Sequence, residues 1–391
     1  MPPMLRLIHT ADVHLGARHA DLGSQAAVLR ERQFVAFRAT VDLALAEQVD
    51  VLLIAGDLFD SNTQPRRSVE RAVAELKRLS DAAIRVVIIP GTHDVYDRAS
   101  VYRAYDLAAM AGLPSDSDRL VVLTPDRPDV VYGILDLAIH GFVFPTKRAP
   151  RSPLAGFDAA PDGRARLHVG LVHGSLAIPG KTDADEVVFT ANEIAASHLD
   201  YLALGHWHSA RRGQAGGTTW AYSGAPEPVA VDQDRAGGVL LVTLDERSGA
   251  RHVVLEERRV GRTRFDRLEI DAGALAGQPA LVERLLSLAD PDLVLDVSLM
   301  GVRRDDLDVA TDEVERELGD RFFRLRVRDA SSAALPEGPL APPDTIAGAL
   351  VRDLQASIAE AEAGERIAES LELRDALRLA RLMLDGHEVA L

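Results

Sequence analysis

The sequence contains no cysteine among its 391 residues. Disulfide bonds and thiolate-bound zinc are therefore excluded, and the fold needs no oxidising compartment. No apolar run of about 18 residues, the length that a membrane-spanning helix needs, occurs in it. The opening residues, Met-Pro-Pro-Met-Leu-Arg, have no apolar signal core. We expect a cytoplasmic protein with no membrane partner.

Positive charge is also scarce. Lysine and arginine number 44 against 60 acidic residues, which gives a formal net charge of −16. This balance argues against a protein that coats nucleic acid by bulk charge. It does not exclude a nuclease, because bound metal ions and local arginines can supply the positive potential at a site. The length predicts two or three domains.

What the sequence does contain is a set of polar residues that follow apolar runs. The first run, Leu5–Ile8, predicts a buried strand, and Asp12 and His14 come soon after it. In an extended chain, side chains two residues apart point to the same side, so both can face one point. A carboxylate beside an imidazole suits a divalent cation.

The same pattern recurs at the ends of four further apolar runs. In chain order the candidates are Asp57, His93 (within Gly91-Thr92-His93-Asp94), His173, and the pair His206 and His208. Taken alone, each has a simpler explanation, because a Gly-Asp is commonly a turn and a histidine commonly a surface or core residue. The ordered set is far less probable by chance. Since ligands collect at the carboxyl ends of strands in α/β sheets, it predicts one metal site.

Strands alternating with helical segments over residues 1–260 predict an α/β layered domain. The strands expected at 219–224 and 238–244 are placed in a second sheet. A small α/β unit is expected over residues 261–332, followed by a proline-rich linker at 333–343. Apolar residues at helical spacing predict a helical tail over 344–391.

The motifs resemble those of the calcineurin-like metallophosphoesterases over roughly residues 4–245. His-Thr-Ala-Asp-Val-His-Leu-Gly, Ala-Gly-Asp-Leu-Phe-Asp and Tyr-Ser-Gly-Ala-Pro-Glu look most like the SbcD-type nuclease subunit of a DNA double-strand-break repair complex. The resemblance implies a four-layer α/β/β/α sandwich with a small α/β capping domain and a helical tail. It also implies DNA as substrate, a homodimer, and an SbcC-like ABC-type ATPase that binds the tail.

The resemblance further implies two divalent metal ions, usually manganese. Asp57 would bridge them, and two such ions polarise a phosphodiester for in-line attack. The other ligands would divide between the ions, with Asp12, His14 and His208 on one and His173 and His206 on the other. His93 would be the general acid, because the pKa of an imidazole lies near working pH.

Thr92 departs from the family motif Gly-Asn-His-Asp, in which the asparagine lends its amide oxygen to the second ion. A threonine hydroxyl is a neutral oxygen on a shorter, stiffer side chain, so we expect the second ion to bind more weakly. Three hypotheses stay open. They are a DNA nuclease subunit (a 3′–5′ exonuclease or endonuclease), a stand-alone phosphoesterase on nucleotides or small phosphodiesters, and a non-catalytic DNA-binding or scaffold subunit.

Two further features suggest contacts with nucleic acid. The arginine pairs at 66–67, 211–212 and 303–304 could contact DNA phosphates, although each pair alone is explained as well by a solvated surface. Tyr96, Tyr102 and Tyr105 follow the His93 motif and could stack on bases. Packing within the core or a loop is an equal alternative for these tyrosines.

Overall fold

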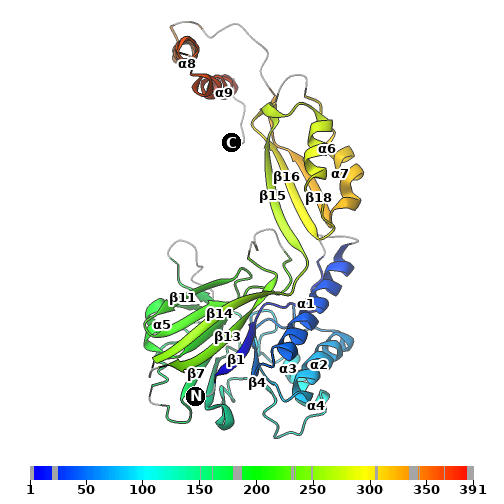
Figure 1. The fold of residues 1–391 in the computed structure, drawn as a ribbon, viewed down its shortest axis with the longest axis vertical. Coiled ribbons are helices and arrows are strands. Elements are labelled where there is room, and N and C mark those ends of the chain that lie inside the picture. The colour runs from blue at the N-terminus through cyan, green and yellow to red at the C-terminus, as the bar shows by residue number, and fades with distance from the viewer. Residues whose placement is uncertain are drawn as a thin grey trace. The chain divides into compact units, whose positions relative to one another are not determined.

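The structure is a computed structural model (Figure 1). It describes residues 4–19, 25–149, 151–160, 162–178, 187–229, 233, 235–247, 250–303, 307–333, 342, 344–364 and 366–384. The chain divides into two compact units, Met1–Thr263 and Arg264–Leu391. None of the helices in the described ranges is long and apolar enough to cross a membrane.

The first unit is built on two six-stranded sheets that share an apolar core (Figure 1). The first sheet has the order β14 (Ala250–Arg259), β13 (Gly238–Arg247), β1 (Leu5–Thr10), β2 (Val51–Ala55), β3 (Arg85–Ile89) and β4 (Leu120–Val122). The second has the order β11 (Arg211–Ala215), β12 (Thr218–Tyr222), β10 (Tyr201–Gly205), β7 (Leu167–His173), β6 (Leu137–Phe142) and β5 (Asp129–Tyr132). Leu7, Leu53 and Leu171 are among the side chains buried between them.

Helices cover the outer faces of both sheets. On the first sheet they are α1 (Ala26–Ala46), α2 (Arg66–Asp81), α3 (Val101–Ala104) and α4 (Leu107–Met110), joined to it through residues such as Phe37 and Leu76. On the second sheet α5 (Ala191–Ala196) packs beside the loop that holds Leu154. A short ladder, β8 (Ser175–Leu176) with β9 (Val188–Phe189), and a 3-10 turn, η2 (Gly133–Leu135), complete the unit. The predicted α/β/β/α architecture is confirmed (Figure 1).

The placement of β13 in the second sheet was wrong. This strand pairs antiparallel with β1 in the first sheet, with Leu7 opposite Val242. It forms a hairpin with β14. The sequence analysis did not predict β14 because the last four residues of this strand are glutamate and arginine. The hairpin extends the open edge of the first sheet, and local patterning cannot tell which edge an antiparallel strand will join.

A buried polar pair connects the two sheets. His9 of β1 is fully buried, and its Nδ1 lies 2.7 Å from the hydroxyl oxygen of Tyr201 in β10. Burial lowers the pKa of His9 to about 3. The imidazole is therefore neutral in the folded protein across the physiological pH range.

The neutral state of His9 makes the stability of the first unit depend on pH. An unfolded histidine titrates near pH 6.5, so the stabilisation is complete above that value and is lost as the pH falls toward about 3. We expect this histidine to lower the free energy of unfolding by about 2 kcal/mol between about pH 7 and about pH 5. Urea denaturation of the His9→Leu, Tyr201→Phe double variant should show a correspondingly flatter pH dependence. An unchanged dependence would contradict the assignment.

The second unit contains a three-stranded parallel sheet in the order β15 (Arg264–Asp271), β16 (Leu293–Met300), β18 (Arg324–Asp329). Two helices, α6 (Gln278–Leu286) and α7 (Thr311–Leu318), contribute Leu281, Leu285 and Val314 to its core. Its smaller elements are η3 (Ala272–Ala274), β17 (Val302–Arg303), η4 (Gly319–Arg321) and β19 (Ser332–Ala333).

Two long helices, α8 (Ile346–Ala363) and α9 (Ile367–Leu384), pack against each other in the same unit. Thr345 caps the first of them by accepting a hydrogen bond from the Gly348 N–H at 3.0 Å. Of the expected linker at 333–343, only residues 333 and 342 are described, and the other nine lie outside the described residues.

Candidate metal centre

Four of the six predicted metal ligands have a backbone conformation that is rare for residues with a side chain. The φ angles are +54° at Asp12, +50° at His14, +53° at Asp57 and +98° at His206. Non-glycine residues seldom adopt positive φ, and such strained residues cluster at functional sites. Here they follow the carboxyl ends of β1, β2 and β10, where the chain turns out of the sheets.

Backbone hydrogen bonds hold these loops together. The Asp12 N–H donates to the Gly56 carbonyl at 3.1 Å, and the His14 N–H donates to the Asp57 carbonyl at 3.0 Å. Across to the second sheet, the His206 N–H donates to both carboxylate oxygens of Asp12, at 3.0 and 3.1 Å. The ends of strands in different sheets are thereby fixed at one rim.

Two glycines allow this close approach. A Cβ atom at Gly91 would lie 2.3 Å from Oδ1 of Asp57, and one at Gly205 would lie 1.9 Å from the carbonyl oxygen of Ala55. No side chain fits at either distance without displacing a loop. The glycines beside the predicted ligands therefore serve packing, and neither requires a positive φ.

Asp57 lies at the centre of the cluster and is almost fully buried. Its Oδ1 accepts a hydrogen bond from the His93 N–H at 2.7 Å. Its Oδ2 lies 3.1 Å from Nε2 of His173 and 3.8 Å from Nε2 of His14. Burial alone would raise the pKa of Asp57, but the neighbouring imidazoles, His173 foremost, bring the pKa below its ordinary value. The carboxylate is therefore ionised.

His173 is oriented by the strand beside it. Its Nδ1–H donates to the carbonyl of Ala55 at 3.0 Å, which leaves Nε2 facing Asp57. Burial opposes protonation, but the charge of Asp57 and its hydrogen bond raise the pKa of His173 to about 9. A backbone bond to one imidazole nitrogen is how proteins commonly aim the other nitrogen at a metal.

The imidazole rings of His14 and His208 lie close together, with their Nε2 atoms facing each other. Their Nε2 atoms are 3.2 Å apart, the ring centroids are 4.9 Å apart and the planes are inclined at 46°. Rings placed end to end at that N···N distance would have centroids farther apart, so the two rings bend toward a common point. Nε2 of His208 also lies 3.9 Å from Oδ1 of Asp12.

Two groups of potential ligand atoms result, in each of which all atoms lie within 4.8 Å of one another. One contains Asp12, His14 and His208, and the other contains Asp12, Asp57 and His173. Convergent imidazole nitrogens and carboxylate oxygens are the donors that a divalent first-row metal prefers, so these residues fit such an ion. His206 belongs to neither group among the described residues, although its ring centroid lies 5.2 Å from that of His173.

A third group, His14, Asp60 and His93, shares His14 with the first. A fourth, His140, Asp162 and His168, resembles a metal site but differs in geometry. Nε2 of His140 lies 3.1 Å from Nδ1 of His168, and the ring planes are only 15° apart with centroids at 5.4 Å. That separation places the rings end to end along an N–H···N hydrogen bond, with no room for an ion between the nitrogens. Arg164 also donates to both carboxylate oxygens of Asp162. We assign this group as a hydrogen-bonded histidine pair.

Thr92 occupies the position of the family asparagine. Its Oγ1 lies 3.5 Å from Oδ2 of Asp57 and 3.4 Å from Nε2 of His173. The hydroxyl is thus directed toward the group that contains Asp57 and His173, at the outer limit of hydrogen-bonding distance.

His93 lies at the exposed edge of the cluster. Its ring centroid is 4.6 Å from that of His14, and its Nδ1–H donates to the backbone carbonyl of Asp60 at 3.0 Å. About half of the side chain is exposed. The Nε2 atom is consequently the nitrogen available to an incoming substrate.

Two acidic residues near the site were missed as functional candidates, although both stand in the motifs that the sequence analysis quoted. Oδ1 of Asp60 lies 3.3 Å from Nδ1 of His14. Asp94 accepts hydrogen bonds from the N–H groups of Gly91 and Phe59 and from the Tyr102 hydroxyl. Burial, and then the charge of Asp57, raises the pKa of Asp94 to about 6. The sequence signal that could have identified them is their spacing, because Asp60 follows Asp57 by three residues and Asp94 comes directly after His93.

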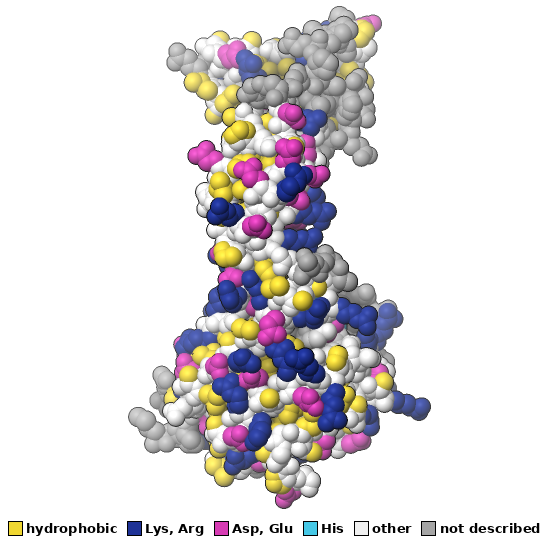
Figure 2. Space-filling view, turned by 90° about the vertical axis from the view of Figure 1, so that its right-hand side faces the viewer, with side chains coloured by type: hydrophobic (Ala, Val, Ile, Leu, Met, Phe, Trp, Pro, Cys, Tyr) yellow, Lys and Arg dark blue, Asp and Glu magenta, His cyan; other side chains and the backbone are white. Residues whose placement is uncertain are grey.

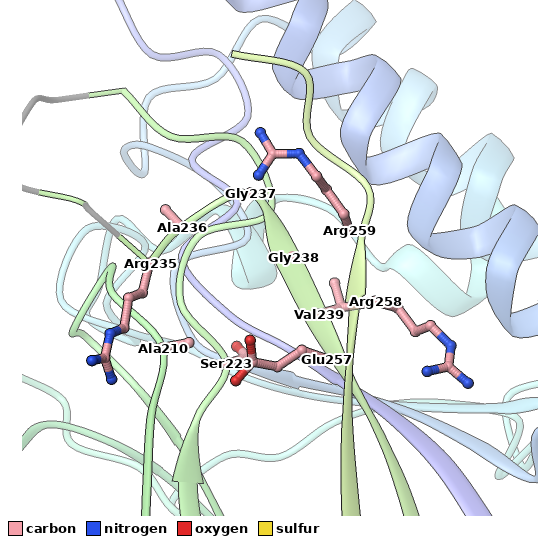
Figure 3. Close-up of a pocket in the computed structure, with 10 residues that line it drawn as sticks. All are labelled: Ala210, Ser223, Arg235, Ala236, Gly237, Gly238, Val239, Glu257, Arg258 and Arg259. Atoms are coloured by element: carbon pink, nitrogen blue, oxygen red, sulfur yellow. The ribbon is translucent and has the colours of Figure 1, made fainter. Parts of the chain in front are cut away.

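A separate cavity of about 360 Å³ lies beside the loop that follows His208 (Figure 3). The carboxylate of Glu257 points into it, whereas the side chains of Arg235, Arg258 and Arg259 spread outward around it (Figure 3). Its lining includes none of the predicted ligands. A carboxylate at its centre does not favour an anion, and we assign no ligand to this cavity.

Residues 5–210 match the calcineurin-like phosphoesterase family. The chain belongs to this family. The resemblance inferred from the motifs is therefore confirmed, and the family implies that divalent metal ions are bound. The match spans β1 to the loop after β10, which includes every predicted ligand.

Three curated relatives illustrate the similarity. A protein of Aeropyrum pernix named DNA double-strand break repair protein Mre11 is 32% identical over 276 residues, which cover 69% of this chain and 64% of that protein. One of the same name from Halobacterium salinarum is 27% identical over 362 residues, covering 90% and 86%. The uncharacterized metallophosphoesterase YhaO of Bacillus subtilis is 27% identical over 209 residues, covering 52% and 48%. The chain thus spans less than two thirds of the first of these relatives.

Proposed function

We propose that this protein is a metal-dependent nuclease that hydrolyses phosphodiester bonds in DNA. The observation that carries the proposal is the convergence of loops from both sheets on the buried carboxylate of Asp57. The names of the Aeropyrum and Halobacterium relatives support DNA as the substrate. A 3′–5′ exonuclease or endonuclease within an SbcCD-like repair complex is the specific form that we propose.

We propose two ions, and manganese as their identity, held around Asp57. Asp12, His14 and His208 would hold one ion together with Asp57, and His173 and His206 would hold the other with it. When bound, such ions polarise the phosphodiester and offset the charge that develops on its oxygens. The protein supplies the fixed donors. The Asp12 carboxylate is already held by the His206 N–H, and the His173 imidazole by the Ala55 carbonyl.

His93 is proposed as the general acid. The Asp60 carbonyl fixes its Nδ1–H, so a proton carried on Nε2 can pass to the oxygen that leaves when the phosphodiester is cut. Its exposed position at the edge of the cluster gives a long substrate access to that nitrogen. The buried histidines of the centre do not have this access.

One assay separates the three functional hypotheses. Linear duplex DNA and bis-p-nitrophenyl phosphate are each incubated with the protein and manganese. Degradation of DNA is the expected result and supports a nuclease. Hydrolysis of the small ester alone would identify a stand-alone phosphoesterase. Activity on neither substrate, with DNA binding retained, would identify a non-catalytic DNA-binding or scaffold subunit.

Thr92 favours the non-catalytic alternative and provides its own test. Replacing Thr92 by asparagine restores the amide oxygen of the family motif. We expect calorimetric titration to show about tenfold tighter binding of the second manganese ion in Thr92→Asn, with faster DNA hydrolysis. Thr92→Ser, which keeps a hydroxyl, is the matched control and should match the natural chain. Identical manganese affinity and turnover in Thr92→Asn and the natural chain would refute the role given to this position.

We further propose that the C-terminal helices dock on an SbcC-like ABC-type ATPase. Several apolar side chains of α8 and α9 remain exposed, including Ile346 at 90% and Ile367 at 74%. Apolar residues on an exposed helix pair are typical of a helix-docking surface. In this organisation residues 1–260 form the nuclease domain and residues 261–332 form a capping domain. Residues 333–343 form a linker, and residues 344–391 form the docking segment. We also propose that the complex is built on a homodimer.

A further inference from the structure

Trp207 separates the two predicted ligands His206 and His208, and its indole is fixed within the fold. The indole Nε1–H donates to Oγ of Ser175 at 3.1 Å. The ring stacks on Tyr222, with centroids 4.5 Å apart and planes 13° apart. Because Ser175 follows His173 by two residues, the indole links the segment that carries His206 and His208 to the segment that follows His173.

Arg211 is held against the same indole. Its guanidinium carbon lies 5.3 Å from the centroid of the Trp207 ring, which is a cation–π distance. Contact with the ring face leaves the five N–H donors of the guanidinium free for other partners. No carboxylate in the described part of the chain lies within ion-pair distance of Arg211, and the residue is exposed.

The charge of the rest of the chain bears on what Arg211 can contribute. On the face that Figure 2 shows, lysine and arginine are interspersed with aspartate and glutamate. With a net charge of −16, the chain cannot attract a polyanion by bulk charge. A nucleic acid must then be bound through local arginines, and Arg211 contacts Trp207, the residue that stands between His206 and His208 in the sequence.

We propose that Arg211 binds a backbone phosphate of the nucleic-acid strand beside the bond that is cut, with Trp207 as the platform that positions it. A guanidinium matches two phosphate oxygens with two parallel N–H donors, and its stacking on an aromatic ring reduces the freedom lost on binding. The inference rests on the proposed nuclease function and names the group that places its substrate.

Arg212 provides a matched control. It is the next residue of β11, and neighbouring residues of a strand point to opposite faces. Arg211 lies opposite Tyr222 and Arg212 opposite Ala221, and Nη1 of Arg212 donates to the Leu255 carbonyl at 3.3 Å. The two substitutions to glutamine remove the same charge one residue apart, so a difference in DNA binding between them cannot come from net charge.

The test measures binding of a fluorescein-labelled DNA duplex to the full chain in EDTA, by anisotropy over a series of salt concentrations. We expect Arg211→Gln to weaken binding about tenfold. The slope of log affinity against log salt concentration should fall by about one, the loss of a single phosphate contact. Arg212→Gln should bind like the natural chain. Calorimetric manganese affinity should be unchanged in both variants, which separates loss of a phosphate contact from damage to the metal centre.

Two outcomes would overturn the inference, and they can be told apart. If the natural chain binds and degrades DNA but Arg211→Gln and Arg212→Gln behave alike, the role of Arg211 is wrong and the nuclease proposal survives. If the natural chain neither binds nor degrades the duplex, the nuclease proposal fails and the inference fails with it.

Discussion

Replacing Asp57 by asparagine is expected to lower manganese-dependent DNA hydrolysis by at least about a thousandfold. Both oxygens of this carboxylate are used, one by the His93 N–H and the other facing His173 and His14. The amide keeps the shape but removes the negative charge that two cations would share. Calorimetric titration with manganese should therefore show the loss of both ions, and a nuclease assay the loss of turnover.

Asp162→Asn is the control for this substitution. Asp162 stands beside two histidines in the other group that superficially resembles a metal site, but there the imidazoles are hydrogen-bonded to each other. Manganese binding and DNA hydrolysis should both be retained in Asp162→Asn. Loss of manganese in this variant, with retention in Asp57→Asn, would show that the metal lies at the His140 group and that the assignment of the centre is wrong.

The second large effect is expected from His93→Gln, and it depends on the substrate. DNA hydrolysis should fall by about 10²–10³, because the leaving sugar oxygen needs a proton that only an acid can give. Hydrolysis of bis-p-nitrophenyl phosphate should change little, since nitrophenolate leaves without protonation. Parallel assays of the two substrates at saturating manganese measure this difference.

Two controls accompany the His93 experiment. Manganese affinity should be unchanged, because His93 is expected to hold a proton rather than an ion. His198→Gln replaces another exposed histidine, one whose Nδ1 lies 2.8 Å from Asp158, and it should leave both activities unchanged. Equal loss on DNA and on the nitrophenyl ester would contradict a general acid and would show that His93 positions the centre.

The strands that carry the site could be predicted from the sequence because they are buried on both faces. Runs such as Val51–Ala55 and Leu167–His173 are almost entirely buried, so their apolar character is continuous. The strands that were missed, β11 and β14, lie at the edges of the two sheets. β11 reads Arg-Arg-Gly-Gln-Ala, and none of residues 251–259 in β14 is buried, so neither resembles a buried strand. Which edge receives β13 depends on the tertiary fold.

In the candidate site, too, the positions of residues along the chain were predictable, whereas features set by contacts between distant loops were not. The positions of Asp12, His14 and Asp57 after strands followed from the sequence, since the polar residues interrupt apolar runs. Their positive φ angles did not, because these arise from hydrogen bonds between loops that are far apart in the chain. The pairing of Trp207 with Arg211 likewise depends on the turn between β10 and β11.

The most direct test of the metal centre is diffraction at the manganese absorption edge from crystals of the full chain grown with manganese. The account predicts anomalous peaks on both sides of the Asp57 carboxylate, one facing His14 and His208 and the other facing His173. The peak facing His173 should be the weaker, since Thr92 stands where the family has asparagine. Peaks only at other sites, such as the His140 pair, or none near Asp57, would contradict it.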